Sequence, residues 1–366
     1  MKSSTALLFV LTLAANSFAL AADELTGARP EGGIVIKFSH AAAPDTPRGQ
    51  AAERFRQLAE QNTNGRVKVE IYPNAQLYND SNEFEALQNG TVQMLAPSLS
   101  RFAALGVREF QLFDLPYIFP NREVLHRVMD VEVGKGLFKK LNAKGVTGLA
   151  YWDNGFKQMS SNRAMRKPTD LTGLKMSIHP SRVIEAQMKA LAASPQVLGA
   201  GEVYAAMQQG VVDGAESPVS DFQALKLHEV QKHLTISNHG YLGYAVVANK
   251  KFWADLPADT RDVLKQAMEE ATRFERDLAQ QENDAALANV IAANTTAVYV
   301  LSPRERTAWQ MALLPVYQEF EDVIGKYLIK SVAYTAQQVL KEQNEADPKG
   351  KKAAGTKKSQ RSSKTE

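Results

Sequence analysis

Cysteine is absent from the 366 residues of this sequence. Its absence excludes disulfide bonds, thiol nucleophiles and metal sites with cysteine ligands. Hydrophobic residues make up 44% of the chain, which is enough to fill one large core or two medium ones. We therefore expect a globular protein that is stabilised by the burial of apolar side chains, without covalent cross-links.

Motifs of the common enzyme classes are missing as well. The chain has no G-x-S-x-G, no P-loop, no H-E-x-x-H and no G-x-G-x-x-G. None of the six histidines has metal-ligand spacing, and His228 and His233, five residues apart, fit a surface helix better than a zinc site. Asp114 stands alone among apolar residues, as a turn or cap residue would. We predict that the protein is not an enzyme and that it holds no metal and no cofactor.

The first 21 residues contain the three parts of a secretion signal in the usual order. Lys2 supplies the charge, Ala6–Ala15 the apolar run, and Ala19–Ala21 the small residues of a cleavage site. The apolar run is too short to span a bilayer as a stable helix, and no other segment is long and apolar enough. We predict a signal peptide at residues 1–21 and a periplasmic mature protein. A buried N-terminal helix is the alternative.

Positive charge is concentrated at the C-terminus. Residues 347–366 hold seven Lys or Arg, two Asp or Glu, and no large apolar residue. The formal net charge of the whole chain is +3, but residues 22–346, without the signal peptide and the tail, have a net charge of −3. The charge therefore gives no support for nucleic-acid binding. We predict that residues 347–366 form a disordered, solvated basic tail. Contact with anionic lipid or cell wall is the alternative.

Strands and helices alternate along the first part of the chain. Thr46 followed by Pro47 is typical of a helix start, and the strict alternation of Val67, Val69 and Ile71 is typical of a strand. The expected elements are strands at 34–38, 66–72 and 92–98, with helices beginning at 47 and spanning 80–88. This alternation predicts an α/β fold with a mostly parallel sheet.

A similar set of elements begins at Gly145 and continues through expected helices at 183–191 and 202–209. We predict two α/β lobes, residues 33–153 plus 243–282 and residues 154–242 plus 283–330, followed by a C-terminal helix at 331–346. Residues 257–293 are strongly helical, and about 36 residues at ~1.5 Å each give a helix of roughly 54 Å that would brace both lobes. Ser302 and Glu305 form a capping box that would begin the last helical region.

Two α/β lobes should share a crevice, because ligands of open α/β sheets lie at the carboxyl ends of strands. The loops expected there are Ser39–Pro47, Ala96–Arg101, Trp152–Lys157, Ser177–Ser181 and Glu216–Asp221.

Six stretches in order, spread from residue 39 to residue 253, make the region from about 34 to 328 resemble the DctP family of solute receptors for tripartite ATP-independent periplasmic (TRAP) transporters. They are "SHAAAPDTPRGQAAERF", "FDLPYIF", "YWDNGFKQMSSNRAM", "DLTGLKM", "EVYAAMQQGVVDGAESP" and "EVQKHLTISNHGYLGYAVVANKKFW". The resemblance implies two lobes joined by crossing strands, a long helix, and closure of the lobes on a ligand. The ligand typical of the family is a C4-dicarboxylate.

The resemblance also implies site residues, and three of them depart from the family pattern. Ser177 stands where the family usually has a carboxylate-binding arginine, Ser217 where it has asparagine, and Ala200 where it has an aromatic residue. A serine cannot imitate the two-pronged donor of a guanidinium. Lys157 still matches a family carboxylate contact, and Arg182 is a possible substitute anchor. The other residues expected to line or approach the cleft are His40, Arg48, Ser98, Arg101, Asn154, His239 and Tyr241.

Several of these residues also have a structural explanation. His239 and Tyr241 would order a crossing strand, Arg48 and Arg101 would be surface charges, and Asn154 before Gly155 would be turn chemistry.

We therefore predict a periplasmic receptor that captures a small organic acid, a C4-dicarboxylate by family default, and delivers it to TRAP membrane permease subunits. It would act as a monomer and bind no nucleic acid. One alternative keeps the fold and changes the ligand to a monocarboxylate or an aromatic acid, because the arginine is replaced by Ser177. Another is a receptor that reports ligand occupancy to a membrane kinase.

Overall fold

The computed structural model describes residues 33–79 and 81–346 of the chain. The predicted signal peptide and the predicted basic tail lie outside the described residues. Within the described ranges, no helix is both long and apolar enough to cross a membrane.

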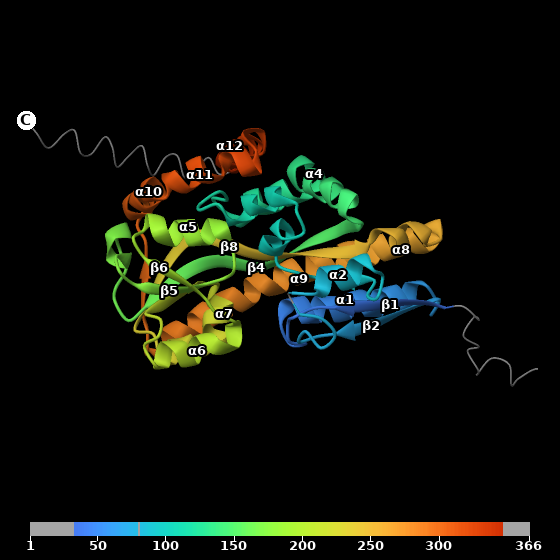
Figure 1. The fold of residues 1–366 in the computed structure, drawn as a ribbon, viewed down its shortest axis with the longest axis horizontal. Coiled ribbons are helices and arrows are strands. Elements are labelled where there is room, and N and C mark those ends of the chain that lie inside the picture. The colour runs from blue at the N-terminus through green and yellow to red at the C-terminus, as the bar shows by residue number, and fades with distance from the viewer. Residues whose placement is uncertain (1–32, 80, 347–366) are drawn as a thin grey trace, which may run out of the picture.

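The described strands form a single sheet, shown in Figure 1. Two short parallel groups lie at its ends, β2-β1-β3 at one end and β7-β5-β6 at the other. Strands β8 and β4 lie between these groups, and β9 pairs with β8. The strand bounds are β1 Ile34–Ser39, β2 Val67–Tyr72, β3 Met94–Leu95, β4 Val146–Ser161, β5 Lys175–Ile178, β6 Ser194–Val197, β7 Gly214–Ser217, β8 His233–Asn249 and β9 Ala297–Val300.

The long strands β4 and β8 pair with each other along nearly their whole length. The pairing is antiparallel and runs from Val146 opposite Asn249 to Ser161 opposite His233. Strand β8 borders β9 near its start and β3 near its end, so it belongs to both halves of the molecule. The prediction of a mostly parallel sheet is therefore correct for the ends and wrong for the centre. The reason is that two strands crossing between lobes in opposite directions must pair antiparallel.

The core is divided on one face of the sheet and continuous on the other. One cluster, with Phe38, Phe55 and Trp152, lies beneath α1 (Pro47–Asn62). A separate cluster around Phe222 lies beneath α6 (Ala200–Gln208) and α7 (Val219–Ala224). On the opposite face a third cluster extends through both halves. The two-lobed fold follows from this division, whereas the lobe boundaries remain a prediction because β4 and β8 run uninterrupted through both lobes.

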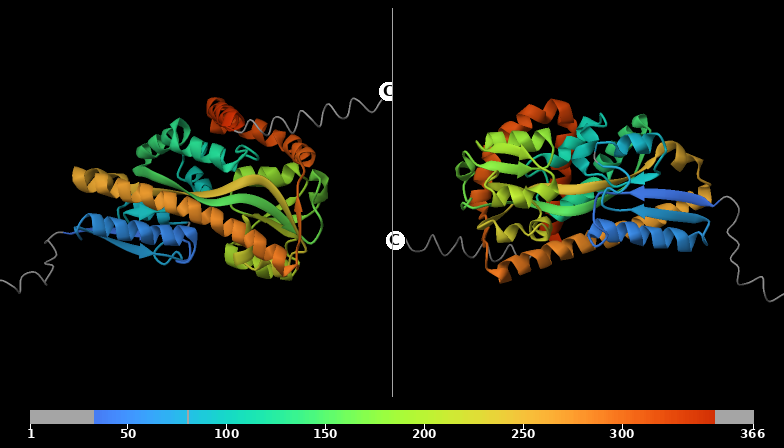
Figure 2. Two further views of the ribbon diagram at one scale, coloured as in Figure 1. Left: turned by 180° about the vertical axis from the view of Figure 1, so that it is seen from behind. Right: turned by 60° about the horizontal axis from the view of Figure 1, so that its bottom comes forward.

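The predicted brace is α9, which spans Ala258–Ala293. Figure 2 shows it running under the long strands from one lobe to the other. It packs against α1 in one lobe and α7 in the other. Its buried residues include Met268 in the first lobe and Val290 in the second, so a single helix contributes to both separate cores.

The predicted helix starts are confirmed at two positions. The Thr46 side chain accepts a hydrogen bond from the backbone N–H of Gly49, and Ser302 and Glu305 form the capping box. Helix α2 starts three residues later than predicted, at Glu83. The remaining helices are α2 Glu83–Gln88, α3 Arg122–Asp130, α4 Glu132–Leu141, α5 Arg182–Ala190, α8 Lys250–Asp255, α10 Pro303–Ala312, α11 Leu314–Ile324 and α12 Lys326–Ala346.

Gly148 on β4 provides a test of the packing between the crossing strands and α4. A Cβ at this position would lie 2.2 Å from the Phe138 ring, which stacks on Tyr151 at 4.1 Å between centroids. We expect Gly148→Ala to lower the free energy of unfolding by ~1–3 kcal/mol, because the stacked pair must move. The measurement is urea unfolding followed by circular dichroism. Gly136→Ala in α4, where the new Cβ meets open space, should be neutral or slightly stabilising; equal effects of the two substitutions would contradict the packing argument.

Candidate functional site

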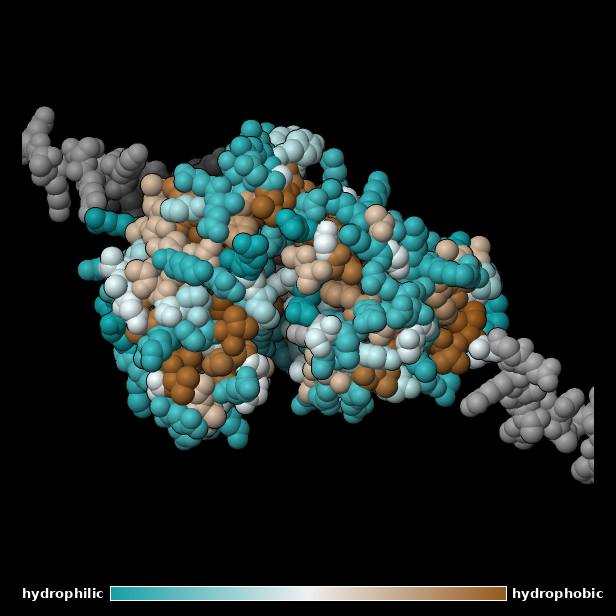
Figure 3. All heavy atoms as spheres, in the orientation of Figure 1, coloured by the Kyte–Doolittle hydropathy of each residue, from teal (hydrophilic) through white to brown (hydrophobic). Residues whose placement is uncertain are grey.

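A cavity of about 610 Å³ lies between the two lobes. Figure 3 shows the hollow that separates the two halves of the surface. Each of the five predicted strand-end loops contributes residues to its wall, among them Thr46, Ser98, Asn154, His179 and Asp221. The loops meet here because β1, β3, β5 and β7 end at the same edge of their parallel groups, and β4 crosses between those groups.

Six of the predicted site residues line this cavity, and the structure brings them together from both lobes. They are Arg48, Ser98, Asn154, Ser177, Ala200 and Ser217. The other six are not among the lining residues, namely His40, Arg101, Lys157, Arg182, His239 and Tyr241.

Lys157 lies behind the cleft wall, where its charge already has a partner. Its Nζ donates a hydrogen bond of 2.9 Å to Oε1 of Glu216, and the side chains are 2% and 1% exposed. His239 Nε2 lies 3.5 Å from the other oxygen of this carboxylate. Burial alone would raise the pKa of Glu216, but the Lys157 ammonium acts in the opposite direction together with His239 and His179, and their combined effect lowers the pKa to about 2. Lys157 therefore neutralises an internal carboxylate, and the role of ligand anchor is not supported for it by this geometry.

Arg182 is also in the wrong place to replace the family arginine. It lies exposed at the start of α5, in a small hollow that it shares with Pro315 and Glu319. Ser181 caps this helix and donates a hydrogen bond of 2.7 Å to Asp114. The capped first turn positions Arg182 against α11, so this geometry gives no support to the substitute-anchor hypothesis.

Arg48 is a cation held in the cleft wall by its surroundings. It lies in the first turn of α1, where Nη1 donates a hydrogen bond of 2.9 Å to the Ala96 carbonyl. Its guanidinium stacks over the Tyr244 ring at 3.8 Å from the centroid, a cation–π contact that restricts its orientation. Within the described residues no carboxylate forms an ion pair with Arg48, and its Nε is buried without a hydrogen-bond partner. It is the residue best placed to bind an anion in the cleft.

The opposite lobe presents Asp221 to the same cavity. Asn154 Nδ2 donates to both Asp221 oxygens at 3.2 and 3.1 Å and to the Tyr244 hydroxyl at 2.9 Å. Ser220 Oγ in turn donates to Asn154 Oδ1 at 3.1 Å. Burial raises the pKa of Asp221 and raises that of Tyr244 to about 12. Asn154 therefore links both lobes at the floor of the cleft. Its role is larger than the formation of a turn, which was the structural explanation for Asn154 before Gly155.

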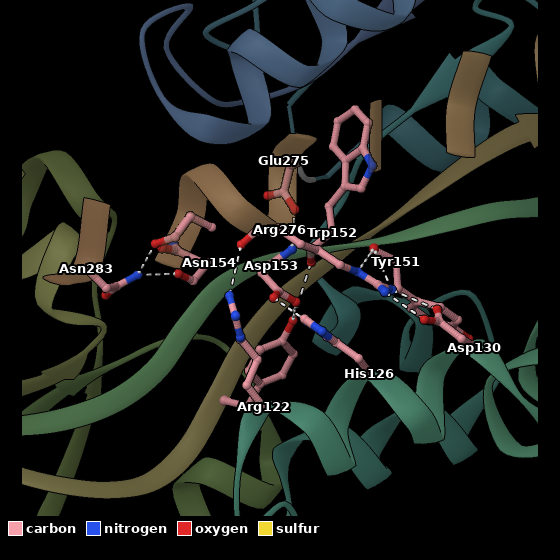
Figure 4. A network of polar contacts seen from close by, with 12 residues as sticks. Arg122, His126, Asp130, Tyr151, Trp152, Asp153, Asn154, Glu275, Arg276 and Asn283 are labelled. Atoms are coloured by element: carbon pink, nitrogen blue, oxygen red, sulfur yellow. Dashed lines mark hydrogen bonds and ion pairs between the residues drawn. The ribbon is translucent and has the colours of Figure 1, made fainter. Parts of the chain in front are cut away.

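A network of polar contacts surrounds the point where β4 crosses between lobes, as Figure 4 shows. Asp153 accepts hydrogen bonds from His126 at 2.6 Å and from the Tyr241 hydroxyl at 2.6 Å. Its backbone N–H donates to Glu275 of α9 at 2.8 Å. Burial, followed by the Asp153 charge, raises the pKa of Glu275 well above its usual value. Tyr241 orders the crossing strand, in agreement with the structural explanation for this residue.

The two remaining predicted residues lie elsewhere. His40 is buried and lines a different, open hollow of about 820 Å³ on the outside of the first lobe, between α1 and α9. That hollow is larger than the cleft, but Arg54 and Glu270 in its wall form an ion pair with each other. Arg101 is half-buried in a short 3₁₀ helix, Leu99–Ala103, outside the cleft wall.

Sequence reasoning missed several residues of the wall. Asp221 and His179 fall inside predicted loops, so the loop pattern gave their location without their role. Tyr244 lies within β8 and Glu282 within α9, where strand or helix periodicity conceals a residue that faces a cavity.

A two-lobed fold with a polar cleft at the crossing strands defines the class of solute-binding receptors. Residues 38–322 match the family described as "Bacterial extracellular solute-binding protein, family 7" (DctP), and the chain belongs to this family. Its members are receptors of TRAP transporters and not a family of enzymes. Among the described residues, no cluster of three His, Asp or Glu could hold a metal ion.

Relatives and solved structures agree with this assignment. The chain is 56% identical over 299 residues to the "C4-dicarboxylate-binding periplasmic protein DctP" of Rhodobacter capsulatus, covering 82% of this chain and 90% of the relative. It is 39% identical over 300 residues to the "C4-dicarboxylate-binding protein DctB" of Bacillus subtilis, covering 82% and 85%. A TRAP solute-binding protein of Shewanella oneidensis with bound succinate superimposes with a TM-score of 0.78 at 37% identity, covering 83% of this chain and 99% of that one.

The buried Lys157–Glu216 pair leads to a first prediction for the site. Lys157→Met should lower the free energy of unfolding by ~3–5 kcal/mol, because it leaves the Glu216 carboxylate buried without its cation. The double variant Lys157→Met, Glu216→Gln should recover part of the loss. The measurement is a double-mutant cycle by urea unfolding at pH 7. If the change in unfolding free energy of the double variant equals the sum of the two single changes, the side chains are not coupled and the ion-pair argument is contradicted.

The same pair predicts part of the acid sensitivity of the fold. Because the pKa of Glu216 is depressed to about 2 from 4.5, its contribution to stability is present above pH 4.5 and is lost as the pH falls towards 2. In Glu216→Gln the decline in unfolding free energy between pH 5 and pH 2.5 should be shallower than in the parent protein. Urea unfolding across this pH range measures it, and parallel curves would refute the assignment.

Proposed function

We propose that this protein is an extracytoplasmic receptor that captures a small organic acid between its lobes and delivers it to the membrane subunits of a TRAP transporter. The C4-dicarboxylates named for its relatives are the first ligand class to consider. The proposal includes export by a cleaved signal peptide and action as a monomer. The single observation that carries it is Arg48, a cation in the wall of an interlobe cavity that forms no ion pair with any described carboxylate.

The proposed capture step follows from the position of the wall residues. Arg48 belongs to α1 in the first lobe, whereas Ser177, Ser217 and Asp221 belong to elements of the second lobe. A ligand that contacts both sets stabilises the closed arrangement of the lobes, and the equilibrium shifts by the difference in binding free energy between the open and closed forms. The crossing point of β4, where the register shifts between Asp153 and Gly155, is the proposed hinge.

A changed ligand is the second candidate, and Ser177 favours it. Ser177 is buried and lines the cavity where the family resemblance implies an arginine. Loss of one partner of a buried charge pair costs ~2–5 kcal/mol, which is roughly thirty- to several-thousand-fold in affinity. A dicarboxylate would therefore lose much of its usual binding energy here, whereas an acid anchored by Arg48 alone would not.

Arg48 provides the test of the proposed function. We expect Arg48→Ala to weaken binding of any acid ligand at least about thirtyfold, because the carboxylate loses its guanidinium partner. Isothermal titration calorimetry would be run on the refolded, ligand-free mature chain with succinate, L-malate and a panel of small monocarboxylates. Closure would be followed by small-angle X-ray scattering.

Arg54→Ala is the matched control, since Arg54 lies on the same helix but faces the outer hollow. It should leave affinity unchanged. The proposal fails if no small acid binds and none reduces the radius of gyration, or if Arg48→Ala binds as well as the parent.

A further inference from the structure

Carboxylates outnumber cations in the wall of the cleft. Five acidic residues line it, whereas Arg48 is the permanently charged cation in the described lining, and His179 carries charge only when protonated. The five acids are Glu83, Asp153, Glu216, Asp221 and Glu282.

Three of these acids are already occupied by the protein. Glu216 pairs with Lys157 and Asp153 with His126, and Glu83 has an interaction partner as well. Asp221 and Glu282 differ from them, because within residues 33–79 and 81–346 neither forms an ion pair with a basic side chain. Within the described part of the chain, the cleft therefore contains two carboxylates without an ion-pair partner.

The pKa shifts of these two acids agree with the finding that neither has an ion-pair partner. Burial, followed by the charges of Asp45 and Asp221, raises the pKa of Glu282. Burial also raises the pKa of Asp221, although the hydrogen bond from Asn154 and the charges of His179, Arg48 and Lys157 act on it in the opposite direction. Cations therefore act on Asp221 through the electric field without forming an ion pair with it, and their combined effect does not compensate its burial.

The rest of the second-lobe wall is small or apolar. Ser177, Ser217 and Ala200 carry no charge, and Val197, 51% exposed, lies beside Leu198 and Val203. A second carboxylate on the ligand would find no guanidinium on this side, and it would lie near carboxylates of its own sign. The Asp221 oxygens accept hydrogen bonds from the single Asn154 amide nitrogen, which leaves acceptor capacity on the carboxylate.

We propose that the ligand of this cleft is a zwitterionic acid, with one carboxylate on Arg48 and an ammonium group facing Asp221 and Glu282. The inference rests on the proposed function and names the ligand class of the same site. The carbon chain between the two charged groups would lie against Val197, Leu198 and Val203. The ammonium supplies the positive charge that the wall lacks, and it replaces the second carboxylate of a C4-dicarboxylate.

The test compares acids of equal chain length by calorimetry. The four-carbon set is butyrate, succinate and 4-aminobutyrate; the five-carbon set is pentanoate, glutarate, 5-aminopentanoate and L-norvaline. At least one amino acid should bind about tenfold or more tighter than both the diacid and the unsubstituted acid of its set, which corresponds to ~1.4 kcal/mol. The inference is overturned if, in both sets, the diacid binds as tightly as every amino acid.

Variants identify the groups responsible. Glu282→Gln and Asp221→Asn should each reduce the preference for the amino acid over the matched diacid by about tenfold, whereas Ser177→Arg should shift preference towards the diacid. Asp284→Asn is the matched control, since it removes the same charge two residues from Glu282 at a position outside the cleft wall. Thermal unfolding checks that each variant is folded. Glu282→Gln breaks no ion pair or hydrogen bond between described side chains. It therefore keeps the test interpretable if Asp221→Asn is unstable.

The two proposals fail separately. If succinate binds tightly and Arg48→Ala abolishes that binding, the receptor function holds and the zwitterion inference is wrong. If none of the acids binds, both are wrong. If an amino acid binds but Glu282→Gln and Asp221→Asn leave the preference intact, the wall acids do not select the ammonium and the inference is again overturned.

Discussion

The antiparallel pairing of β4 with β8 is the constraint on which the rest of the structure depends. These strands carry the chain from one lobe to the other in opposite directions, and their hydrogen bonds join the lobes along the full crossing. Every other described strand attaches to this pair directly or through one or two intervening strands. The cores beneath α1 and α7 are separate clusters on the cleft side, whereas the third core is continuous on the opposite face, and this division is what the proposed closure of the lobes requires.

The same pairing determines which charges remain for a ligand. Strand β7 pairs with the end of β4, with Met159 opposite Glu216, and this register brings the Glu216 carboxylate to the Lys157 ammonium. Two charged residues on adjacent strands thus neutralise each other inside the protein. Arg48 is on α1, away from this ladder, and its contacts are a carbonyl oxygen and an aromatic ring, neither of which removes its charge. A ligand in the cleft therefore meets Arg48, whereas the Lys157 charge is already compensated.

The sequence predicted the architecture better than it predicted the roles of the site residues. Thr46, the long α9 and all five cleft loops could be predicted, because caps, periodicity and strand ends are local properties. The anchoring role of Lys157 could not be assessed, since its partner Glu216 lies 59 residues away and only the strand register joins them. Arg182 failed for a related reason: proximity to Ser177 along the chain says nothing about the direction imposed by a capped helix start. The position of Glu282 in the cavity wall could not be predicted, because a polar residue on a long helix has the same sequence pattern whether it faces a cavity or solvent.

Membership of the DctP family and the selection of a ligand rest on different parts of this molecule. The strands, the brace α9 and the polar contacts around Asp153 belong to the scaffold, which makes up most of the chain. The 56% identity over 299 residues therefore mainly reflects the scaffold. Selection depends on a few wall positions, since a single unmatched charge alters affinity by orders of magnitude. Here Ser177 removes a positive group from one side of the cavity, while Asp221 and Glu282 remain without a cation. If the proposed zwitterionic ligand is correct, a ligand with two negative ends fits the inherited fold but not the charge distribution of this cleft, and the fold alone is then a poor guide to what the cleft binds.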